Sequence, residues 1–246
     1  MIALAIETTS DRLSVAGSQG AREPGSQPAL VERSLEGARR HAAGLFPLIE
    51  EVLSELGGGL GDLQTLAVAD GPGSFTGLRV GFSGAKALLR ARPALELWSA
   101  STLLVRVVGA APPHGARVLV LTSALRGELY AAGYRLDLPR RVETLLPPCL
   151  ATPESLHREA PDLLVADLPD KLQERLADQF AVPLVHGTAS RPSALALLSL
   201  IGVEGGAERV RDVVAWEPGY GRPAEAQVRW EARHGRALAD PARLPR

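Results

Sequence analysis

Several residue types are scarce in this chain of 246 residues, and each scarcity excludes a class of protein. The single cysteine, Cys149, can form neither an intramolecular disulfide nor a zinc site built on cysteines. Neither sign of charge is in excess, because 27 Lys and Arg oppose 28 Asp and Glu. This balance excludes an acidic disordered chain and a strongly basic nucleic-acid-binding domain. Any contact with a nucleic acid would therefore depend on a partner.

Long apolar runs are missing as well. The longest one, from Ala194 to Ile201, is far shorter than the roughly 20 residues of a membrane-spanning helix. The opening run ends at Glu7 and has neither a basic flank nor a small-residue cleavage pattern, so we do not expect a signal peptide. These features predict a cytoplasmic protein without membrane contact. Because Cys149 lies in an apolar stretch, we expect it to be a buried, inert thiol.

The first half of the chain alternates strands with helices. Residues 2–17 predict a β-hairpin, residues 29–35 a third strand and residues 63–69 a buried strand. Apolar residues at three- and four-residue steps predict an amphipathic helix over 41–56, and a second helix is expected over 76–90. Strands that alternate with helices indicate an α/β fold.

The second half repeats the beginning of the first. It is expected to contain a hairpin over 118–133, strands at 141–146 and 163–165, and helices at 153–157, 169–180 and 192–201. This repeat predicts two related lobes. We place the first lobe at 1–110, the second lobe at 111–205 and a C-terminal segment with an Arg-rich tail at 206–246. The boundary is set by Pro112-Pro113, which ends the preceding helix.

A glycine-rich loop, Gly71-Pro-Gly-Ser-Phe-Thr-Gly77, joins the predicted strand 63–69 to the helix that follows it. Its glycine spacing is one residue too long for a dinucleotide-binding fingerprint, and no Lys-Ser or Lys-Thr pair follows to make a P-loop. One interpretation is a tight turn in which Ser74 or Thr76 caps the helix. The other is a loop whose amides face an anion at the helix N-terminus.

The helix after this loop carries few bulky side chains on one side, where Gly77, Gly81, Gly84 and Ala85 follow one another. Each glycine inside a helix costs about 0.5 to 1 kcal/mol relative to alanine, so a compensating contact is expected. Close packing against another helix is such a contact. The neighbour could be the 41–56 helix of the same chain or a helix of another subunit, and both can hold at once.

The string Gly71-Pro-Gly-Ser-Phe-Thr-Gly-Leu-Arg-Val-Gly81, which follows a strand and a helix that bears His41, resembles the signature of the TsaB family. This family is the bacterial partner subunit in the synthesis of threonylcarbamoyladenosine in tRNA. Residues 4–14 resemble the family's first hairpin, and Arg126-Gly-Glu-Leu-Tyr130 resembles its Met-Gly-Glu-Val-Tyr segment. Glu217-Pro-Gly-Tyr-Gly-Arg222 resembles its late Pro-x-Tyr-Leu-Arg segment. The resemblance covers about residues 2–225.

The resemblance implies the two-lobed, duplicated α/β fold of actin, sugar kinases and Hsp70, known as the ASKHA or ribonuclease H-like fold. In that superfamily, acidic residues on the first hairpin of each lobe hold the metal and activate water or substrate. Here Glu7 has no turn glycine beside it, and Ser123 stands where the family usually carries Asp. No glycine lies at 165–169, where an adenosine-binding Gly-x-Gly would be expected. Glu7 is therefore either a turn cap or a relic metal ligand.

These departures imply a chain with no catalytic residues, no bound cofactor and no metal. The resemblance implies a non-catalytic subunit that holds and activates a TsaD-like catalytic subunit together with a TsaE-like ATPase, and that contacts tRNA only through this complex. Without its partner the chain is expected to form a homodimer. An active nucleotide-dependent kinase or ATPase of the same fold is the main alternative, and a peptidase and a purely structural dimer also remain open.

By resemblance, the helices at 41–56 and 76–90 pack against the matching helices of the partner as a four-helix bundle. Arg at Gly81 or Gly84 is then expected to block assembly. The tail at 222–246, with six Arg and three acidic residues, could contact tRNA phosphates or be solvated. The predicted interface residues are His41, Leu45, Leu48, Gly73, Ser74, Phe75, Thr76, Gly77, Gly81 and Gly84.

Overall fold

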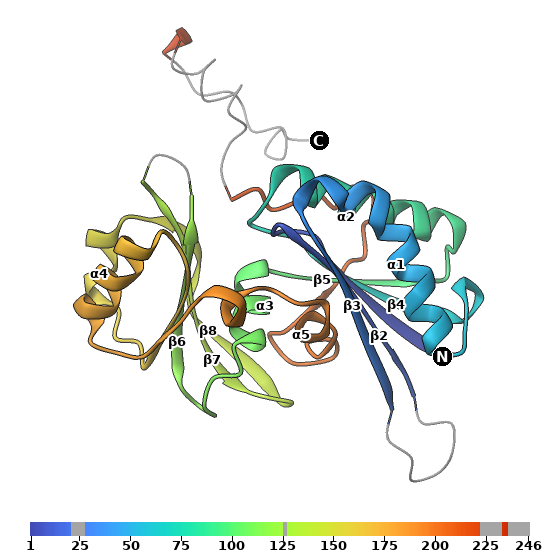
Figure 1. The fold of residues 1–246 in the computed structure, drawn as a ribbon, viewed down its shortest axis with the longest axis horizontal. Coiled ribbons are helices and arrows are strands. Elements are labelled where there is room, and N and C mark those ends of the chain that lie inside the picture. Colours follow the sequence, from blue (N-terminus) through green and yellow to red (C-terminus); the bar gives the residue numbers. More distant parts are fainter. Residues whose placement is uncertain (21–27, 125–126, 222–232, 236–246) are drawn as a thin grey trace.

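The structure is a computed structural model, and it describes residues 1–20, 28–124, 127–221 and 233–235 (Figure 1). Two β-sheets face each other across a pair of helices. Short 3₁₀ turns at Ala38–Arg40, Leu60–Asp62, Pro153–Arg158 and Gly187–Ser190 connect the main elements. These are, in chain order, β1 (Ile2–Glu7), β2 (Arg12–Gln19), β3 (Ala29–Glu36), α1 (His41–Glu55), β4 (Leu63–Ala69), α2 (Phe75–Ala91), β5 (Glu96–Ala100), α3 (Thr102–Gly109), β6 (Arg117–Ser123), β7 (Leu129–Asp137), β8 (Arg141–Ala151), β9 (Leu163–Asp167), α4 (Asp170–Phe180), β10 (Leu184–Val185), α5 (Ala194–Leu198) and β11 (Glu208–Arg209).

Apart from the additional edge strand β11, the two sheets have the same topology. The first sheet has the order β11-β5-β4-β1-β2-β3, and the second has the order β10-β9-β6-β7-β8. In the first sheet β1, β2 and β3 pair antiparallel in succession, and β1 also pairs in parallel with β4. In the second sheet β6, β7 and β8 pair antiparallel in succession, and β6 also pairs in parallel with β9. Parallel pairs of this kind require a helix or a long connection between the strands. The repeated order confirms the predicted two-lobed, duplicated α/β fold.

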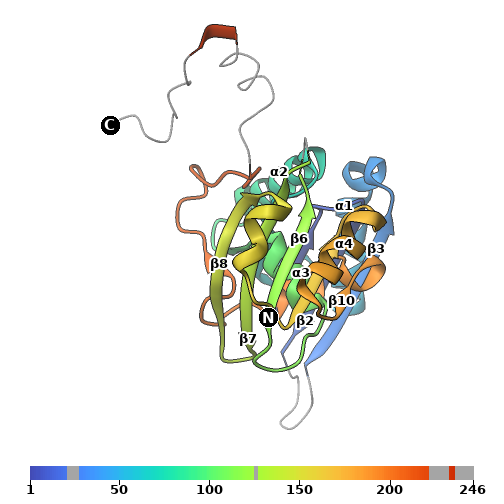
Figure 2. The same cartoon turned by 90° about the vertical axis from the view of Figure 1, so that its left-hand side faces the viewer.

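Helices cover the sheets in layers. Helices α1 and α2 lie on the outer face of the first sheet, α3 and α5 lie between the two sheets, and α4 lies on the outer face of the second sheet (Figure 1). Figure 2, which looks onto the second lobe from outside, shows α4 in front of that sheet and α3 behind it. Among the described residues, every helix is too short or too polar to cross a bilayer.

Strand β1 is buried on both faces because helices lie above and below it. Leu4 and Ile6 point into the core beneath α1 and α2, whereas Ala5 points the other way, into the core that contains α3 and α5. Side chains alternate between the faces of a strand, so the sequence Ile-Ala-Leu-Ala-Ile places large residues on one face and small ones on the other. The small side chains on the second face let α5 approach the sheet closely.

The predicted lobe boundaries need a correction. Helix α5 packs on β1 and β2 of the first lobe, and β11 pairs with β5 at the edge of the first sheet. The chain therefore returns to the first lobe after β10, so the predicted second lobe at 111–205 is too long. The helix predicted at 192–201 is only Ala194–Leu198, and Cys149 is exposed on β8 rather than buried. Most of the predicted Arg-rich tail, 222–232 and 236–246, lies outside the described residues.

Candidate functional site

Helix α2 begins in a tight turn after β4. The hydroxyl of Ser74 accepts a hydrogen bond from the backbone N–H of Gly77 at 3.2 Å, which caps the helix. The backbone N–H of Ser74 donates to the carbonyl oxygen of Thr9, 2.6 Å away on the β1–β2 turn. This amide therefore serves a contact within the protein rather than an anion. The interpretation of Ser74 as the helix cap is confirmed.

The glycines of this segment let α2 lie directly on the β1–β2 turn. A Cβ atom at Gly73 would lie 2.5 Å from the carbonyl oxygen of Thr9, and one at Gly77 would overlap the carbonyl oxygen of Thr8. At Gly81 it would lie 2.5 Å from the hydroxyl oxygen of Thr8. Only glycine allows such an approach to the backbone. The contact that offsets the helical glycines is thus within this chain.

Segments that resemble the TsaB family but are far apart in sequence meet at the start of α2. The backbone N–H of Gly219 donates to the carbonyl oxygen of Asp70 at 2.7 Å, just before the glycine-rich loop. The hydroxyl of Tyr130 donates to the carbonyl oxygen of Tyr220 at 3.0 Å. The rings of Tyr220 and Phe75 are 5.0 Å apart, and Phe75 is about half exposed. The segments around residues 8, 71, 130 and 219 therefore form one junction. Arg126, which belongs to the second of these resemblances, lies outside the described residues.

The structure corrects the predicted accessibility of the interface residues. Gly73, Phe75 and Thr76 are exposed and Ser74 is half-buried, all at the start of α2. The apolar and small stripes on α1 and α2 face the chain's own core, because a 3.6-residue period marks the side that the first sheet covers. The residues buried in this way are His41, Leu45, Leu48, Gly77, Gly81 and Gly84.

Gly84 and His41 show in detail why these residues are buried. A Cβ atom at Gly84 would lie 2.5 Å from Cδ2 of Leu45, so the close helix neighbour of α2 is α1 of the same chain. The Nε2 atom of His41 lies 3.1 Å from the carbonyl oxygen of Ser10, which ties the start of α1 to the β1–β2 turn. A large side chain at Gly84 would therefore separate the two helices of this chain.

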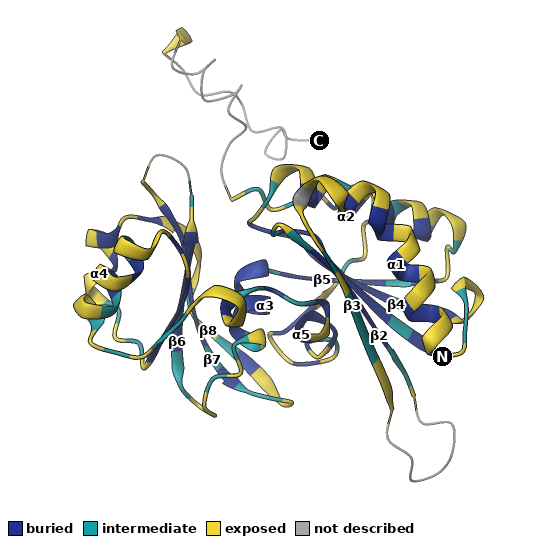
Figure 3. Cartoon of the chain, viewed as in Figure 1, coloured by how far each residue is buried: buried dark blue, intermediate teal, exposed yellow. Residues whose placement is uncertain are grey.

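The opposite side of α1 and α2 is exposed (Figure 3). Beside charged residues such as Glu50 and Arg79, it carries a set of small and apolar residues. Phe46 is 43% exposed on α1, and exposed or half-buried small side chains occur on both helices. We call this surface the outer α1–α2 face. The spacing of its α2 members, at 76, 80, 83 and 87, follows a second helical stripe that could have been found in the sequence. The face consists of Ala42, Ala43, Phe46, Thr76, Val80, Ser83 and Ala87.

A cleft of about 440 Å³ lies between the lobes, beside the start of α2. Its lining includes Thr9, Ser74, Ser123 and Asp167, which come from both lobes. If the resemblance to ASKHA proteins extended to ligand binding, a nucleotide would be expected in this interlobe cleft. Because Ser123 is neutral, the end of β6 offers no carboxylate to a metal ion there.

Glu7 is fully buried at the end of β1 and does not line this cleft. Its Oε1 atom accepts hydrogen bonds from the backbone N–H of Thr9, at 2.6 Å, and from the Thr9 hydroxyl. Burial raises the pKa of Glu7 to about 7, although the bonds from Thr9 and the charges of Arg106 and Arg12 lower it. This geometry fits a turn cap and does not fit a metal ligand in the cleft.

Arg106 on α3 braces the two lobes beneath the cleft, a role that the sequence did not reveal. Its buried guanidinium donates to the carbonyl oxygen of Ser190 at 2.8 Å and forms a 2.8 Å ion pair with Asp167 at the end of β9. An isolated arginine inside an apolar helix gives no sequence signal of its partners, which lie 61 and 84 residues further along the chain.

The duplicated lobes, the strand order and the interlobe cleft define an ASKHA-type α/β protein. The model of the family described as TsaD, tRNA N6-adenosine threonylcarbamoyltransferase, matches residues 35–182. A structure from Pseudomonas aeruginosa, described as an uncharacterized protein with similarity to peptidase YeaZ, aligns with a TM-score of 0.71 at 23% identity, covering 90% of this chain and 99% of that one.

Two curated relatives narrow the class to a family. The Escherichia coli tRNA threonylcarbamoyladenosine biosynthesis protein TsaB is 38% identical over 100 residues, which are 40% of this chain and 43% of that protein. The match thus spans less than half of this relative. An uncharacterized protein of Mycobacterium tuberculosis is 32% identical over 174 residues, 70% of this chain and 73% of that protein. The chain belongs to the TsaB family, also called YeaZ, within the group that the TsaD family model describes.

Proposed function

We propose that this chain is a non-catalytic partner subunit in the synthesis of N6-threonylcarbamoyladenosine in tRNA. Membership of the TsaB family supports the pathway, which the name of the Escherichia coli relative states for that protein. In this role the chain scaffolds and activates a TsaD-like catalytic subunit together with a TsaE-like ATPase. It meets tRNA only within the complex.

The observation that carries this proposal is the outer α1–α2 face. A large apolar side chain exposed among small ones, as Phe46 is here, favours a contact with another surface. Small residues such as Ala43 and Ser83 allow the backbones of two packed helix pairs to come close, and Phe46 supplies a large apolar anchor. The face therefore suits a matching helix pair of the catalytic partner, and the same face of a second copy when the partner is absent.

The interlobe cleft supports a non-catalytic role. Ser123 is neutral, Asp167 is paired with Arg106, and Glu7 is turned into the core. Asp11, which is exposed on the β1–β2 turn, is the one other carboxylate among the described residues that line the cleft. A nucleotide with Mg²⁺ is usually held by carboxylates together with the phosphates. On this proposal the catalytic residues of the complex belong to the TsaD-like subunit.

Reconstitution tests the proposal. The chain is combined with the TsaD-like and TsaE-like subunits and the remaining factors of the same organism, with ATP, threonine, bicarbonate and tRNA, and the modified nucleoside is measured by mass spectrometry. Leaving out this chain should abolish the product, and adding it back should restore the product. If the product forms equally well without the chain, the proposal is wrong.

A second measurement addresses the alternative of an active kinase or ATPase. The isolated chain is titrated with Mg-ATP by calorimetry and assayed for phosphate release. We expect neither binding nor turnover. Micromolar binding accompanied by turnover would favour the active enzyme and contradict a purely scaffolding subunit.

A further inference from the structure

A groove of about 1000 Å³ lies at the far end of α2 from the glycine-rich junction. It is bounded by the C-terminal half of α2, by β5 and by residues 209–214. Its floor is aliphatic, with Leu95 and Leu97 buried and Leu89 and Val213 half-buried. At its margin Val214 is 89% exposed, which leaves a large apolar side chain in solvent.

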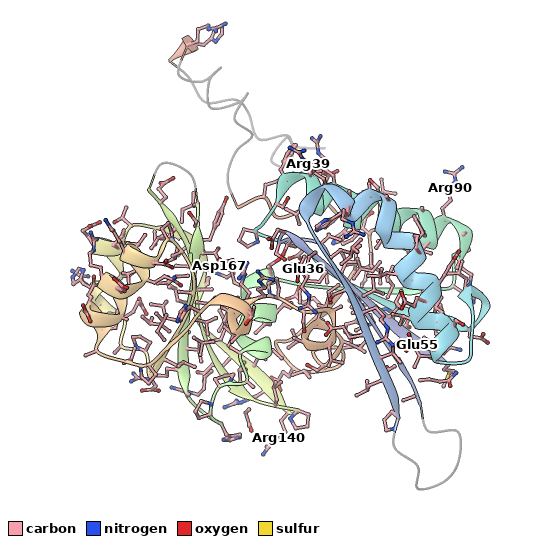
Figure 4. The ribbon with its side chains drawn as sticks, in the orientation of Figure 1. Glu36, Arg39, Glu55, Arg90, Arg140 and Asp167 are labelled. Atoms are coloured by element: carbon pink, nitrogen blue, oxygen red, sulfur yellow. The ribbon has the colours of Figure 1, made fainter. Side chains whose placement is uncertain are left out.

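The rim of this groove is cationic, although the whole chain has a net charge of -1. Lys86, Arg90 and Arg211 line it and form no ion pair with the residues that the structure describes, whereas Arg209 is paired with Glu96 at 2.7 Å. Glu96 is the only acidic residue among the described residues of the lining. Figure 4 shows Arg90 extending from the end of α2 away from the body of the protein. Within the described part of the chain, the rim therefore has three positive charges without an ion-pair partner.

One neighbouring carboxylate, Asp212, forms no ion pair with the rim among the described residues. The Oδ1 atom of Asp212 accepts the backbone N–H groups of Val214 and Ala215, each at 3.0 Å. Asp212 thus caps the turn that follows β11 and does not line the groove. Even with Asp212 and Glu96 counted, the four cations Lys86, Arg90, Arg209 and Arg211 leave a positive excess of charge that could meet an external anion.

An aliphatic floor under a cationic rim fits a protein segment better than a nucleic acid. Single-stranded nucleic acids gain much of their affinity from bases stacked on aromatic rings, and no aromatic side chain lies among the described residues that line the groove. A peptide segment satisfies both features, because an apolar anchor can enter the floor while flanking carboxylates meet the rim.

We propose that this groove binds an acidic segment of the catalytic partner subunit, with carboxylates on either side of an aliphatic or aromatic anchor. The inference rests on the proposed function. Ala87 belongs both to the outer α1–α2 face and to the groove lining, so the two surfaces are continuous. A partner seated on the outer face can therefore extend a segment into the groove. The groove would add contacts with its cationic rim to those made by the small and apolar residues of the outer face.

Charge reversal on the rim tests the inference. The double variant Arg90→Glu/Arg211→Glu is compared with Arg140→Glu/Arg158→Glu, which changes two exposed arginines of the second lobe that make no ion pair within the described part of the chain. Affinity for the purified TsaD-like subunit is measured by calorimetry. We expect about tenfold weaker binding for the groove variant and less than about twofold for the control. The difference should shrink between about 50 mM and about 300 mM NaCl, because salt screens exposed charges.

A second variant tests the apolar part. Val214→Ser should weaken binding about threefold without changing its salt dependence, since it removes an exposed apolar contact and no charge. Unchanged affinity in both variants would overturn the inference and leave the proposed function intact. A loss confined to tRNA retention by the assembled complex would also overturn it, in favour of a phosphate-binding groove. If the wild-type chain does not bind the TsaD-like subunit at all, the proposed function fails and the inference fails with it.

Discussion

At the scale of single residues, Glu7 shows that a carboxylate at the end of the first strand can be buried and therefore unable to bind a metal or substrate. A carboxylate at the end of the first strand was open to two interpretations, because the sequence does not show which way its side chain turns. The structure turns it inward, onto the backbone and hydroxyl of Thr9. A buried carboxylate that serves its own turn is not available to substrate or metal.

This burial predicts a pH-dependent stability. The pKa of Glu7 is raised to about 7 in the folded protein, above its ordinary value of 4.5 in the unfolded chain. The folded state therefore binds the proton more tightly, and the stabilisation is complete below the unfolded pKa and lost as the pH rises through 7. Glu7→Gln cannot titrate. Between about pH 5.5 and about pH 8 the wild type should lose about 2 kcal/mol more of its free energy of unfolding than the variant.

Urea denaturation at both pH values measures this difference. Glu50→Gln, at an exposed position on α1, is the matched control and should follow the wild type. If the pH dependence of Glu7→Gln is parallel to that of the wild type, Glu7 does not titrate in this range.

Gly77 provides a second residue-scale prediction. Alanine favours a helix by about 1 kcal/mol over glycine, but its Cβ would overlap the carbonyl oxygen of Thr8. Overpacking against backbone outweighs that gain, so Gly77→Ala should lower the free energy of unfolding by about 1 to 3 kcal/mol. Ser83→Ala, on the exposed side of the same helix, should change it by less than about 0.5 kcal/mol. Equal stability of the two variants in denaturant titrations would contradict the close contact of α2 with the β1–β2 turn.

At the scale of the elements, periodicity predicted the helices well. The helices expected at 41–56 and 76–90 are His41–Glu55 and Phe75–Ala91, because their apolar residues repeat along the side that the first sheet covers. The same periodicity also supplied most of the predicted interface residues, and these are buried in the structure. A repeat of this kind identifies buried positions, and in a single chain these face the chain's own core. The outer α1–α2 face, which we propose as the interface, is the weaker, small-residue stripe on the other side.

This correction changes the mutation that tests assembly. Arg at Gly81 or Gly84 would collide with Thr8 or Leu45 and damage the fold itself. Ser83→Arg instead places a long cation on the outer α1–α2 face. We expect this variant to keep the wild-type far-UV circular dichroism and thermal midpoint but to lose self-association in light scattering and co-purification with the TsaD-like subunit. Retention of both assemblies by the folded variant would exclude this face as the interface.

At the scale of the whole molecule, local sequence reasoning found the duplication but not the path of the chain between the lobes. The hairpins at the start of each lobe are local, so their patterns were visible. The return of α5 and β11 to the first lobe depends on contacts between distant segments, such as the hydrogen bond from the backbone N–H of Ala194 to the hydroxyl of Ser14 at 2.9 Å. No local pattern distinguishes a helix that covers one sheet from a helix that covers the other.

The two lobes also share a core. Ala5 and Ala67 of the first sheet, Val120 and Ala132 of the second and Leu197 of α5 belong to one buried apolar cluster. Arg106 adds polar links from α3 to Asp167 and Ser190. Neither sheet has its inner face covered without residues from the rest of the chain. The lobes are therefore expected to unfold together, in one transition.

Truncation distinguishes one cooperative unfolding transition from the separate unfolding of two independent domains. The fragment 1–110 contains β1 to β5, α1, α2 and α3 but lacks α5 and β11, so the inner face of its sheet loses the cover that α5 provides. We expect this fragment to expose apolar surface and to show no cooperative thermal transition, whereas the fragment 1–221 should melt cooperatively like the full chain. Circular dichroism melting and dye binding to exposed apolar surface measure both properties. A cooperative transition in fragment 1–110 would mean that the first lobe folds without the returning segment, and that the shared core contributes little to the stability of either lobe.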